Sequence, residues 1–68
     1  MSWRRYVRSR VVVNLKSDCA VEAVLYRQTG RLLELRDATI HEPGSPPAKA
    51  DGAIVVELSQ VDYVQIVG

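Results

Sequence analysis

The stretch VVVNLKSDCAVEAVLYRQTG at residues 11–30 decides the fold class, because its side chains alternate with a period of two in two runs separated by a turn. This period is typical of strands that bury one face. The residues expected on the buried face are Val11, Val13 and Leu15 in the first run and Val21, Ala23 and Leu25 in the second. Ser17-Asp18 and Gly30 are turn residues. We therefore predict antiparallel strands at 11–16 and 20–27.

A third strand is predicted at residues 31–40, with Leu33, Leu35 and Asp37 on one side. A helix is the alternative for 31–36, because this segment contains good helix formers. The glycine before it and the short alternating runs around it favour a strand. The first three strands would then form an antiparallel meander.

The segment 41–52 contains all three prolines, two of the four glycines and no large apolar residue. Prolines lack the amide that a sheet ladder requires, so this segment is predicted to be a loop of about a dozen residues. Such a loop serves either as a surface linker or as an arm that reaches a partner. Two more strands are predicted after it, at 53–58 and 61–67, joined by a short corner at Ser59-Gln60.

A short α-helix is expected at residues 2–9, with Ser2 as its N-cap. Trp3 and Tyr6 fall on one face at helical spacing, and the arginines of this segment spread over the other. A helix of two turns is marginal by itself. We therefore expect it to lie on the sheet.

Four segments of the sequence resemble Sm-like (LSm) proteins. They are YVRSRVVVNLKS at 6–17, VEAVL at 21–25, LELRDA at 33–38, and GAIVV at 52–56 followed by VDYVQI at 61–66. The first resembles the family's passage from a helix into a V-x-V-x-L-K-S strand. The next two are similar to V-x-G-x-L, with Ala23 at the glycine position, and to L-x-L-x-D-A of the first Sm motif. The last resembles the second Sm motif.

The resemblance implies a fold for the whole chain. Residues 1–68 would form a single all-β domain, a small and strongly bent five-stranded antiparallel barrel of the Sm-like or SH3-like kind. A short N-terminal α-helix would precede the barrel.

The resemblance fails at the residues that bind uridine in RNA-binding members of the family. Those members use an aspartate and an asparagine in the loop between the second and third strands, and an Arg-Gly pair before the fifth strand. Here that loop is Gln28-Thr29-Gly30-Arg31, the asparagine position falls on Leu32 or Leu33, and Glu57-Leu58 replaces the Arg-Gly pair. A glutamate cannot donate to phosphate and repels it, so we expect the usual single-stranded RNA site to be absent or weak.

The composition is that of a small folded domain whose core alone gives limited stability. With 68 residues, 47% of them hydrophobic and 25% charged, the chain falls outside the disordered class. A core of this size supplies no more than about 3–5 kcal/mol unless disulfides, a metal or self-association add to it. Cys19 is the only cysteine and His41 the only histidine, so an internal disulfide and a Cys/His metal cage are both excluded. We expect no cofactor and infer self-association.

The sequence contains no apolar run of about 20 residues and no signal-peptide core after the N-terminal arginines. We expect no membrane contact and a cytoplasmic location, or a place in the virion if a bacteriophage encodes the chain. A glycine-rich phosphate loop and paired carboxylates are also missing, and neither Cys19 nor His41 has a partner for nucleophilic chemistry. The chain is predicted not to be an enzyme, and no small-molecule substrate is evident.

Arginines are the candidate nucleic-acid contacts. Four of the nine basic residues lie within residues 1–10, which contain no acid, whereas residues 11–68 carry a formal charge of −3. The candidates are Arg4, Arg5, Arg8 and Arg10 near the N-terminus and Arg27 and Arg31 beside a turn. The N-terminal arginines would form a face that contacts phosphate. Repeated around a ring, Arg27 and Arg31 would form a positive annulus able to hold a polyanion. The alternative is that they are solvated or pair with acids, which for the turn would be Glu34 and Asp37.

A homo-oligomeric ring is the leading hypothesis for assembly, because a short sheet has exposed edges that need covering. The strand at 53–58 of one subunit would pair with the strand at 61–67 of the next, and Val55, Val64 and Ile66 would carry the contacts. One hypothesis for its role is a structural or interaction scaffold, as among small Sm-like proteins encoded by bacteriophages, and the replaced uridine pocket favours it. The other is a diverged, RNA chaperone-like ring that binds nucleic acid through its arginines.

Overall fold

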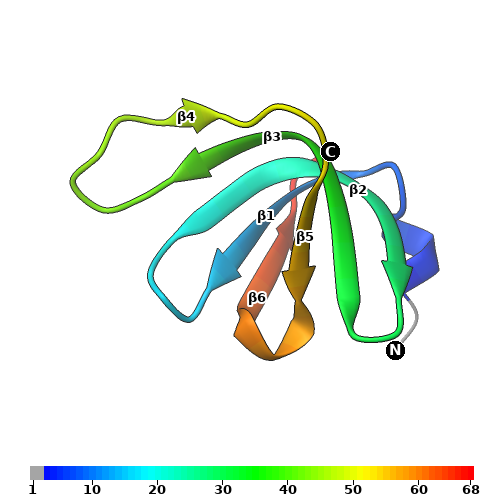
Figure 1. Ribbon diagram of the computed structural model, residues 1–68. Coiled ribbons are helices and arrows are strands. Elements are labelled where there is room, and N and C mark those ends of the chain that lie inside the picture. The colour runs from blue at the N-terminus through cyan, green and yellow to red at the C-terminus, as the bar shows by residue number, and fades with distance from the viewer. Residues whose placement is uncertain (1–2) are drawn as a thin grey trace.

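The computed structural model describes residues 3–68, which form an antiparallel β-sheet and two short 3-10 helices (Figure 1). In chain order the elements are η1 (Trp3–Tyr6), β1 (Arg10–Leu15), β2 (Ala20–Thr29), β3 (Leu32–His41), β4 (Ala48–Lys49), β5 (Ile54–Glu57), η2 (Leu58–Gln60) and β6 (Val61–Ile66). The sheet order is β4-β3-β2-β1-β6, and β5 pairs with the first half of β3. The predicted all-β class and the antiparallel meander of the first three strands are confirmed.

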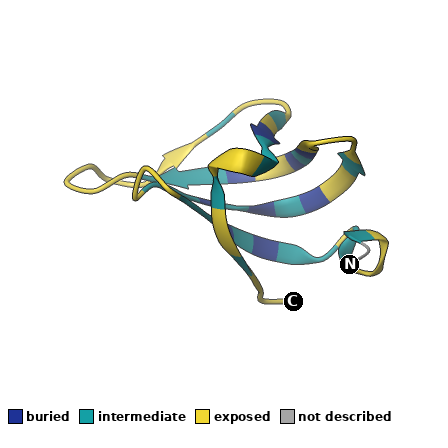
Figure 2. Cartoon of the chain, turned by 90° about the horizontal axis from the view of Figure 1, so that it is seen from below, coloured by how far each residue is buried: buried dark blue, intermediate teal, exposed yellow. Residues whose placement is uncertain are grey.

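The core lies on one face of the meander, here called the inner face. Alternation places Val11 and Val13 of β1 beside Ala23 and Val21 of β2, and none of the four is more than 3% exposed. The nine buried residues are Val11, Val13, Val21, Ala23, Leu25, Leu33, Leu35, Ala38 and Val56. Figure 2 shows these buried residues as bands along the long strands. Full burial of a valine or leucine side chain contributes about 1.5–3 kcal/mol, so this face is the main source of stability.

A β-bulge at Asp37 interrupts the alternation of β3. Here β3 has one more residue than β2 between the paired positions on either side of Ala23. Asp37 takes the left-handed conformation, with a φ of +54°, which aspartate tolerates better than most residues. The extra residue places Ala38 on the inner face, fully buried. The expectation that Asp37 shares a face with Leu33 and Leu35 is therefore wrong.

A second bulge lies on β2 at Tyr26, between the pairs that Leu25 and Arg27 make with β3. Bulges bend the strand that carries them and increase its twist. Figure 1 shows β2 and β3 curving strongly along their length. The first half of β3 thereby lies beside β5, and the second half extends into an arm with β4.

The predicted N-terminal α-helix at 2–9 is wrong in type and length, because η1 is a 3-10 helix of four residues. The carbonyl of Tyr6 accepts a hydrogen bond from the amide of Ser9 at 2.9 Å, and Arg8 has a φ of +76°, which cannot continue a helix. The amide of Arg8 donates instead to the carbonyl of Leu25 at 2.7 Å. The predicted cap, Ser2, lies outside the described residues. Within residues 3–68 no helix is long and apolar enough to cross a membrane.

The segment 41–52 is not the uninterrupted loop that the prolines predicted. Ala48 and Lys49 form β4, which pairs with Thr39 and Ile40 of β3, so the described chain has six strands rather than five. At the tip of the arm the amide of Ser45 donates to the carbonyl of Glu42 at 3.2 Å. The prolines at 43, 46 and 47 lie between the two strands, where no ladder amide is needed.

The corner between β5 and β6 is organised by Glu57, which caps η2. Its carboxylate accepts hydrogen bonds from the amide of Ser59 at 2.6 Å and from the Ser59 hydroxyl. The amide of Leu58 donates to the carbonyl of Arg31 at 2.7 Å. The corner is therefore tied to the turn between β2 and β3.

Candidate subunit interface and arginine surfaces

Besides the two-residue strand β4 at one end of the sheet, two longer strands have an unpaired edge, namely β5 and β6. β5 pairs with β3 along one side, and β6 pairs with β1 along one side. Among the described residues, no strand pairs with the other side of either. An unpaired edge presents N–H and C=O groups that bind another strand readily. These two edges are therefore candidate binding surfaces.

The edge strand β5 has one face in the core and one toward solvent. Ile54 and Val56 lie opposite Leu35 and Leu33 of β3, which places them on the inner face. Val55 points to the outer face and is 57% exposed, although it is β-branched and apolar. An apolar side chain this exposed on an edge strand marks a place where another chain can pack.

The edge strand β6 is less buried than β5. Val64 and Ile66 lie opposite Val13 and Val11 of β1, so they share the inner face. Ile66 is nevertheless 43% exposed, and none of the residues of β6 is buried. Tyr63 lies on the outer face and is 56% exposed. Both faces of β6 thus carry apolar surface that residues 3–68 leave exposed.

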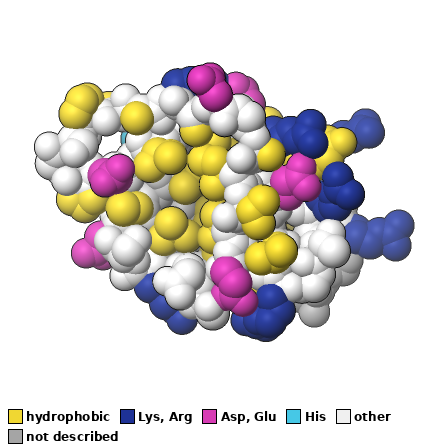
Figure 3. Space-filling model, in the orientation of Figure 1, with side chains coloured by type: hydrophobic (Ala, Val, Ile, Leu, Met, Phe, Trp, Pro, Cys, Tyr) yellow, Lys and Arg dark blue, Asp and Glu magenta, His cyan; other side chains and the backbone are white. Residues whose placement is uncertain are grey.

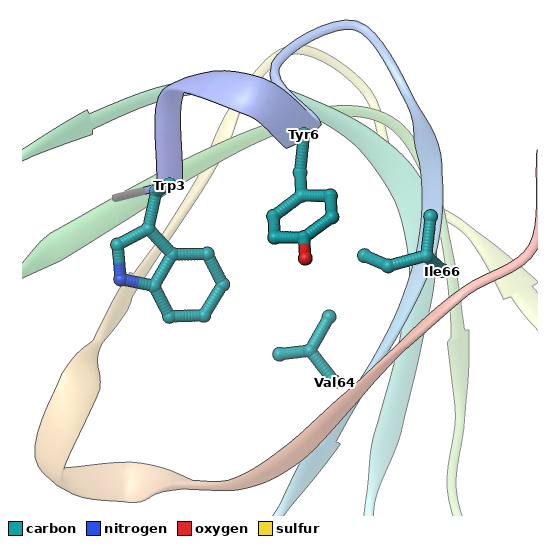
Figure 4. A pocket seen from close by; sticks show the side chains of 4 residues that line it. All are labelled: Trp3, Tyr6, Val64 and Ile66. Atoms are coloured by element: carbon teal, nitrogen blue, oxygen red, sulfur yellow. The ribbon is translucent and has the colours of Figure 1, made fainter. Parts of the chain in front are cut away.

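A small apolar pocket lies between η1 and β6. It has a volume of about 220 Å³ and is lined by Trp3, Tyr6, Val64 and Ile66. Figure 4 shows the two rings and the two aliphatic side chains pointing into one common space. Trp3, Tyr6 and Val64 are only partly buried. The inner face is therefore incompletely filled beside the unpaired edge of β6.

The three residues predicted for the interface lie on these strands, Val55 on the outer face of β5 and Val64 and Ile66 on the inner face of β6. Tyr63 was not predicted as an interface residue, and Trp3 and Tyr6 were not predicted to line a pocket. The alternation of β6 places Tyr63 opposite to Val64, which was a signal for its exposure. Nothing in the sequence indicated that η1 and β6 would line a common pocket.

Among the candidate arginines, carboxylates lie close to Arg10, Arg27 and Arg31. Arg10 binds Asp37 at 2.8 Å and lies 3.9 Å from Glu22. Arg27 lies 3.4 Å from Glu34, as the alternative for this turn expected. These pairs are partly exposed, so each contributes little to stability. They do reduce the positive charge offered to phosphate.

Arg31 pairs with Glu57 rather than with Asp37, at 3.1 Å from Nε to Oε1. The Ser59 hydroxyl and amide lower the pKa of Glu57 below its usual value, and Arg31 adds to this effect. The pair joins the turn between β2 and β3 to the corner between β5 and β6. The Glu57 carboxylate thus partly neutralises the positive charge of Arg31.

The remaining three candidates, Arg4, Arg5 and Arg8, are exposed and lie in or directly after η1. The guanidinium of Arg5 lies 5.4 Å from the ring centre of Tyr6. In Figure 3 basic side chains project from the end of the molecule where η1 lies, while apolar side chains gather in the middle of this face over β5 and its neighbours. The structure therefore separates a basic end from an apolar centre.

Asp37 connects the arm to the meander. Its carboxylate binds Lys49 of β4 and Arg10 of β1, and Lys49, followed by Arg10, lowers its pKa. His41 lies 3.5 Å from Glu22, and Cys19 is half-buried. In the part of the chain that the structure describes, no group of three or more His, Cys, Asp or Glu is placed to hold a metal ion.

The sequence matches no protein-family model and no curated protein. Solved structures are similar over nearly the whole chain. A chain of a heptameric archaeal Sm protein has a TM-score of 0.81 at 23% identity, with 96% of this chain and 94% of that chain covered. A chain of the P. aerophilum SmAP1 heptamer has a TM-score of 0.82 at 23% identity, with 96% and 86% covered. A chain of the NatC complex bound to CoA has a TM-score of 0.83 at 18% identity, with 98% and 86% covered.

Proposed function

We propose that this chain, which has the Sm-like fold, assembles into a homo-oligomeric ring and serves as a non-catalytic structural or interaction scaffold. The observation that carries the proposal is the pair of unpaired sheet edges, one on β5 and one on β6. Pairing of β5 in one subunit with β6 in the next covers both edges. Because the two edges differ, the interface is head-to-tail and suits a ring.

The side chains on the two edges support this pairing. Val55 is the most exposed large apolar residue of β5, and Tyr63 is its counterpart on β6. Two of the similar solved structures are heptamers of Sm-type proteins. The core has only nine buried residues, so an interface that buries more apolar surface would add to the stability of the chain.

A scaffold role is favoured over RNA binding by the Arg31–Glu57 pair. In the family's RNA-binding members, the position that corresponds to Glu57 holds an arginine that is available to nucleic acid. Here the corner carries a carboxylate with a lowered pKa, so it stays ionised at neutral pH and repels phosphate. The proposal places the ring in the cytoplasm or, if a bacteriophage encodes it, in the virion.

Light scattering coupled to size-exclusion chromatography tests the assembly. At micromolar concentration we expect a single species whose mass is a fixed multiple of the subunit mass. A monomer under these conditions would overturn the ring, and with it the scaffold role.

A second candidate function is a nucleic-acid-binding ring, and the exposed basic segment favours it. Arg4, Arg5 and Arg8 lie in or closely after η1, and in Figure 3 basic side chains project from the end of the molecule where η1 lies. If they bind phosphate, affinity for single-stranded RNA or duplex DNA must fall steeply as salt rises. Replacement of Arg5 and Arg8 by Gln should then flatten that dependence. Undetectable binding at low salt would remove this function and leave the scaffold.

A further inference from the structure

The hydrogen bonds of β5 show which backbone groups its free edge presents. Along an antiparallel ladder, successive residues bond alternately to the strand on one side and to the strand on the other. The amide of Leu58 donates to the carbonyl of Arg31, which directly precedes β3, so every second residue back along β5 also bonds toward β3. The N–H and C=O groups of Val55 and Glu57 therefore point to the free edge.

The free edge of β6 is read in the same way. The amide of Val67 donates to the carbonyl of Arg10 in β1 at 2.9 Å, and every second residue back to Tyr63 bonds to β1 as well. The residues between them, Val64 and Ile66, point their backbone groups away from β1. No strand in residues 3–68 pairs with these groups.

These two sets restrict how β5 of one subunit pairs with β6 of the next. Opposite residues of an antiparallel pair exchange N–H···O bonds only where the groups of both point toward each other. Val55 therefore lies opposite Val64 or Ile66, because a slip by one residue sets free groups against groups that are already bonded. Opposite residues also share a face. The outer-face side chain of Val55 thus lies beside inner-face side chains of its neighbour.

The pocket between η1 and β6 lies on this same inner face. The lining residues that the structure describes are Trp3, Tyr6, Val64 and Ile66, none of them charged (Figure 4). The volume of about 220 Å³ is below the 300–1,000 Å³ typical of small-molecule sites. Val55 is apolar and 57% exposed in the single chain, so it has surface to bury in such a pocket.

The charges on the two strands favour Ile66 over Val64 as the residue opposite Val55. If Val55 lies opposite Val64, then Glu57 lies opposite Asp62, and like charges in opposite positions are destabilising. If Val55 lies opposite Ile66, no such pair forms. Glu57 then lies opposite Val64.

The carboxylate of Glu57 has partners in its own subunit in either register. It accepts a hydrogen bond from the amide of Ser59 at 2.6 Å and pairs with Arg31 at 3.1 Å. It therefore needs no partner from the neighbouring strand.

The other face of the strand pair favours the same register. Val67 is 54% exposed, and it then lies opposite the half-buried Ile54 of the neighbour. In the alternative register Val67 lies opposite Gly52, before the start of β5. The register with Ile66 thus covers exposed apolar residues on both faces.

We infer that Val55 of each subunit packs into the pocket between η1 and β6 of the next, in an antiparallel pairing that sets Val55 opposite Ile66 and Glu57 opposite Val64. This inference rests on the proposed ring and adds the register and the occupant of the pocket. Both pairs exchange N–H···O bonds between groups that no strand in residues 3–68 uses.

Cysteine cross-linking tests the register. In a Cys19→Ser background, a chain with Val55→Cys is refolded together with a chain with Ile66→Cys and oxidised mildly. The Cα atoms of a hydrogen-bonded pair lie about 5.5 Å apart, which suits a disulfide, whereas diagonal neighbours lie about 7–8 Å apart. We expect covalent dimers from this mixture and far fewer when Val64→Cys or Gln65→Cys replaces Ile66→Cys.

The outcomes separate the inference from the proposed function. Preferred cross-linking of position 55 to position 64 would show a register shifted by two, and preferred cross-linking to position 65 would show parallel pairing. Either result, or oligomers that cross-link in none of the mixtures, would overturn the register. Monomers in every mixture, measured by light scattering before oxidation, would overturn the ring itself. Each single-cysteine chain oxidised alone is the matched control.

Trp3 reports on the occupant, because it is the only tryptophan. At a concentration where light scattering shows assembled protein, Val55→Ala should make Trp3 more accessible to acrylamide. Val67→Ala removes the same atoms from the opposite face of the interface and should not change the quenching. If quenching does not respond to Val55→Ala, or responds equally to both changes, Val55 is not the occupant.

A mixed assembly shows which subunit supplies the occupant. Adding an excess of Trp3→Phe chains that keep Val55 to the Val55→Ala chains should restore the protection of Trp3, because most neighbours then supply the valine. Assemblies that form but leave Trp3 accessible would overturn the inference, since the protecting valine would then belong to the same chain as the tryptophan.

Discussion

The meander of β1 to β3 and the C-terminal segment from β5 to the end of the chain differ in how far they bury their own apolar residues. Eight of the nine buried residues belong to the meander, and only Val56 belongs to the later segment. Conversely, four of the six exposed large apolar residues lie in the later segment, namely Val55, Tyr63, Ile66 and Val67. Figure 2 shows the same contrast as buried bands on the long strands and exposure toward the C-terminus. The meander makes its core internally, whereas the C-terminal segment leaves apolar surface exposed, which the proposed ring would cover.

The largest expected effect comes from breaking the meander. Leu35 is fully buried opposite Leu25, so Leu35→Ala should cost about 2–5 kcal/mol through lost burial and a cavity. That is as much as a core of this size supplies, so most of the chain should be unfolded in the absence of assembly. Circular dichroism during a urea titration measures the loss. Leu32→Ala, at an exposed site on the same strand, is the control and should shift the midpoint far less.

The next effect separates assembly from folding. Val55→Lys places a charge on the exposed face of β5, where the single chain tolerates it, but the paired edge would have to bury it. We expect a loss of about 2 kcal/mol per interface, which raises the concentration for half-assembly more than tenfold. Light scattering over a dilution series measures this shift.

Tyr26→Lys is the matched control for the edge substitution. Tyr26 is also exposed, at 42%, but it lies on β2, which is separated from the β5 edge by β3. Equal loss of assembly in both variants would contradict the assignment of the interface to the β5 edge.

A smaller effect is expected at low pH, which should destabilise the meander through Asp37 and the C-terminal segment through Glu57. The pKa values of Asp37 and Glu57 are lower in the folded chain than in the unfolded chain. Their contribution to the free energy of unfolding is therefore present above the unfolded pKa values of about 4, and it is lost as the pH falls through the folded pKa values. Asp37→Asn, which still tolerates a positive φ, should flatten the dependence of the urea midpoint on pH below about pH 4. Glu42→Gln, on the exposed tip of the arm, should leave that dependence unchanged; an equal flattening there would contradict the assignment.

The smallest effect is expected at the basic end. Replacement of Arg5 and Arg8 by Gln should change the free energy of unfolding by no more than about 0.5 kcal/mol, because both side chains are exposed. The same change should leave the mass of the assembly as it was. A shift in either measurement would show that these arginines contact the sheet or a neighbouring subunit.

The sequence predicted the meander well, because alternation at Val11, Val13, Val21 and Leu25 is a local property of the chain. It did not predict the bulge at Asp37, since the left-handed conformation there depends on the partner strand. The two residues of β4 were also missed, because their pairing with β3 outweighs the prolines around them only in three dimensions.

The candidate site was only partly accessible from the sequence. Val55, Val64 and Ile66 follow from strand alternation, whereas the pairing of Arg10 with Asp37 joins residues 27 positions apart. The same limit applies to the Arg31–Glu57 pair and to the pocket between η1 and β6. Contacts of this kind depend on tertiary structure, and no spacing in the sequence encodes them.

The curvature that the bulges at Tyr26 and Asp37 give to β2 and β3 has a consequence for stoichiometry. A head-to-tail interface closes into a ring only if the rotation from one subunit to the next divides a full circle, and otherwise grows into an open helix. In the proposed ring, that rotation depends on the angle between the β5 and β6 edges, which lie on either side of the bent strands. Removal of a bulge should therefore alter the number of copies in the proposed ring, or convert it into a filament, without touching any residue at the interface.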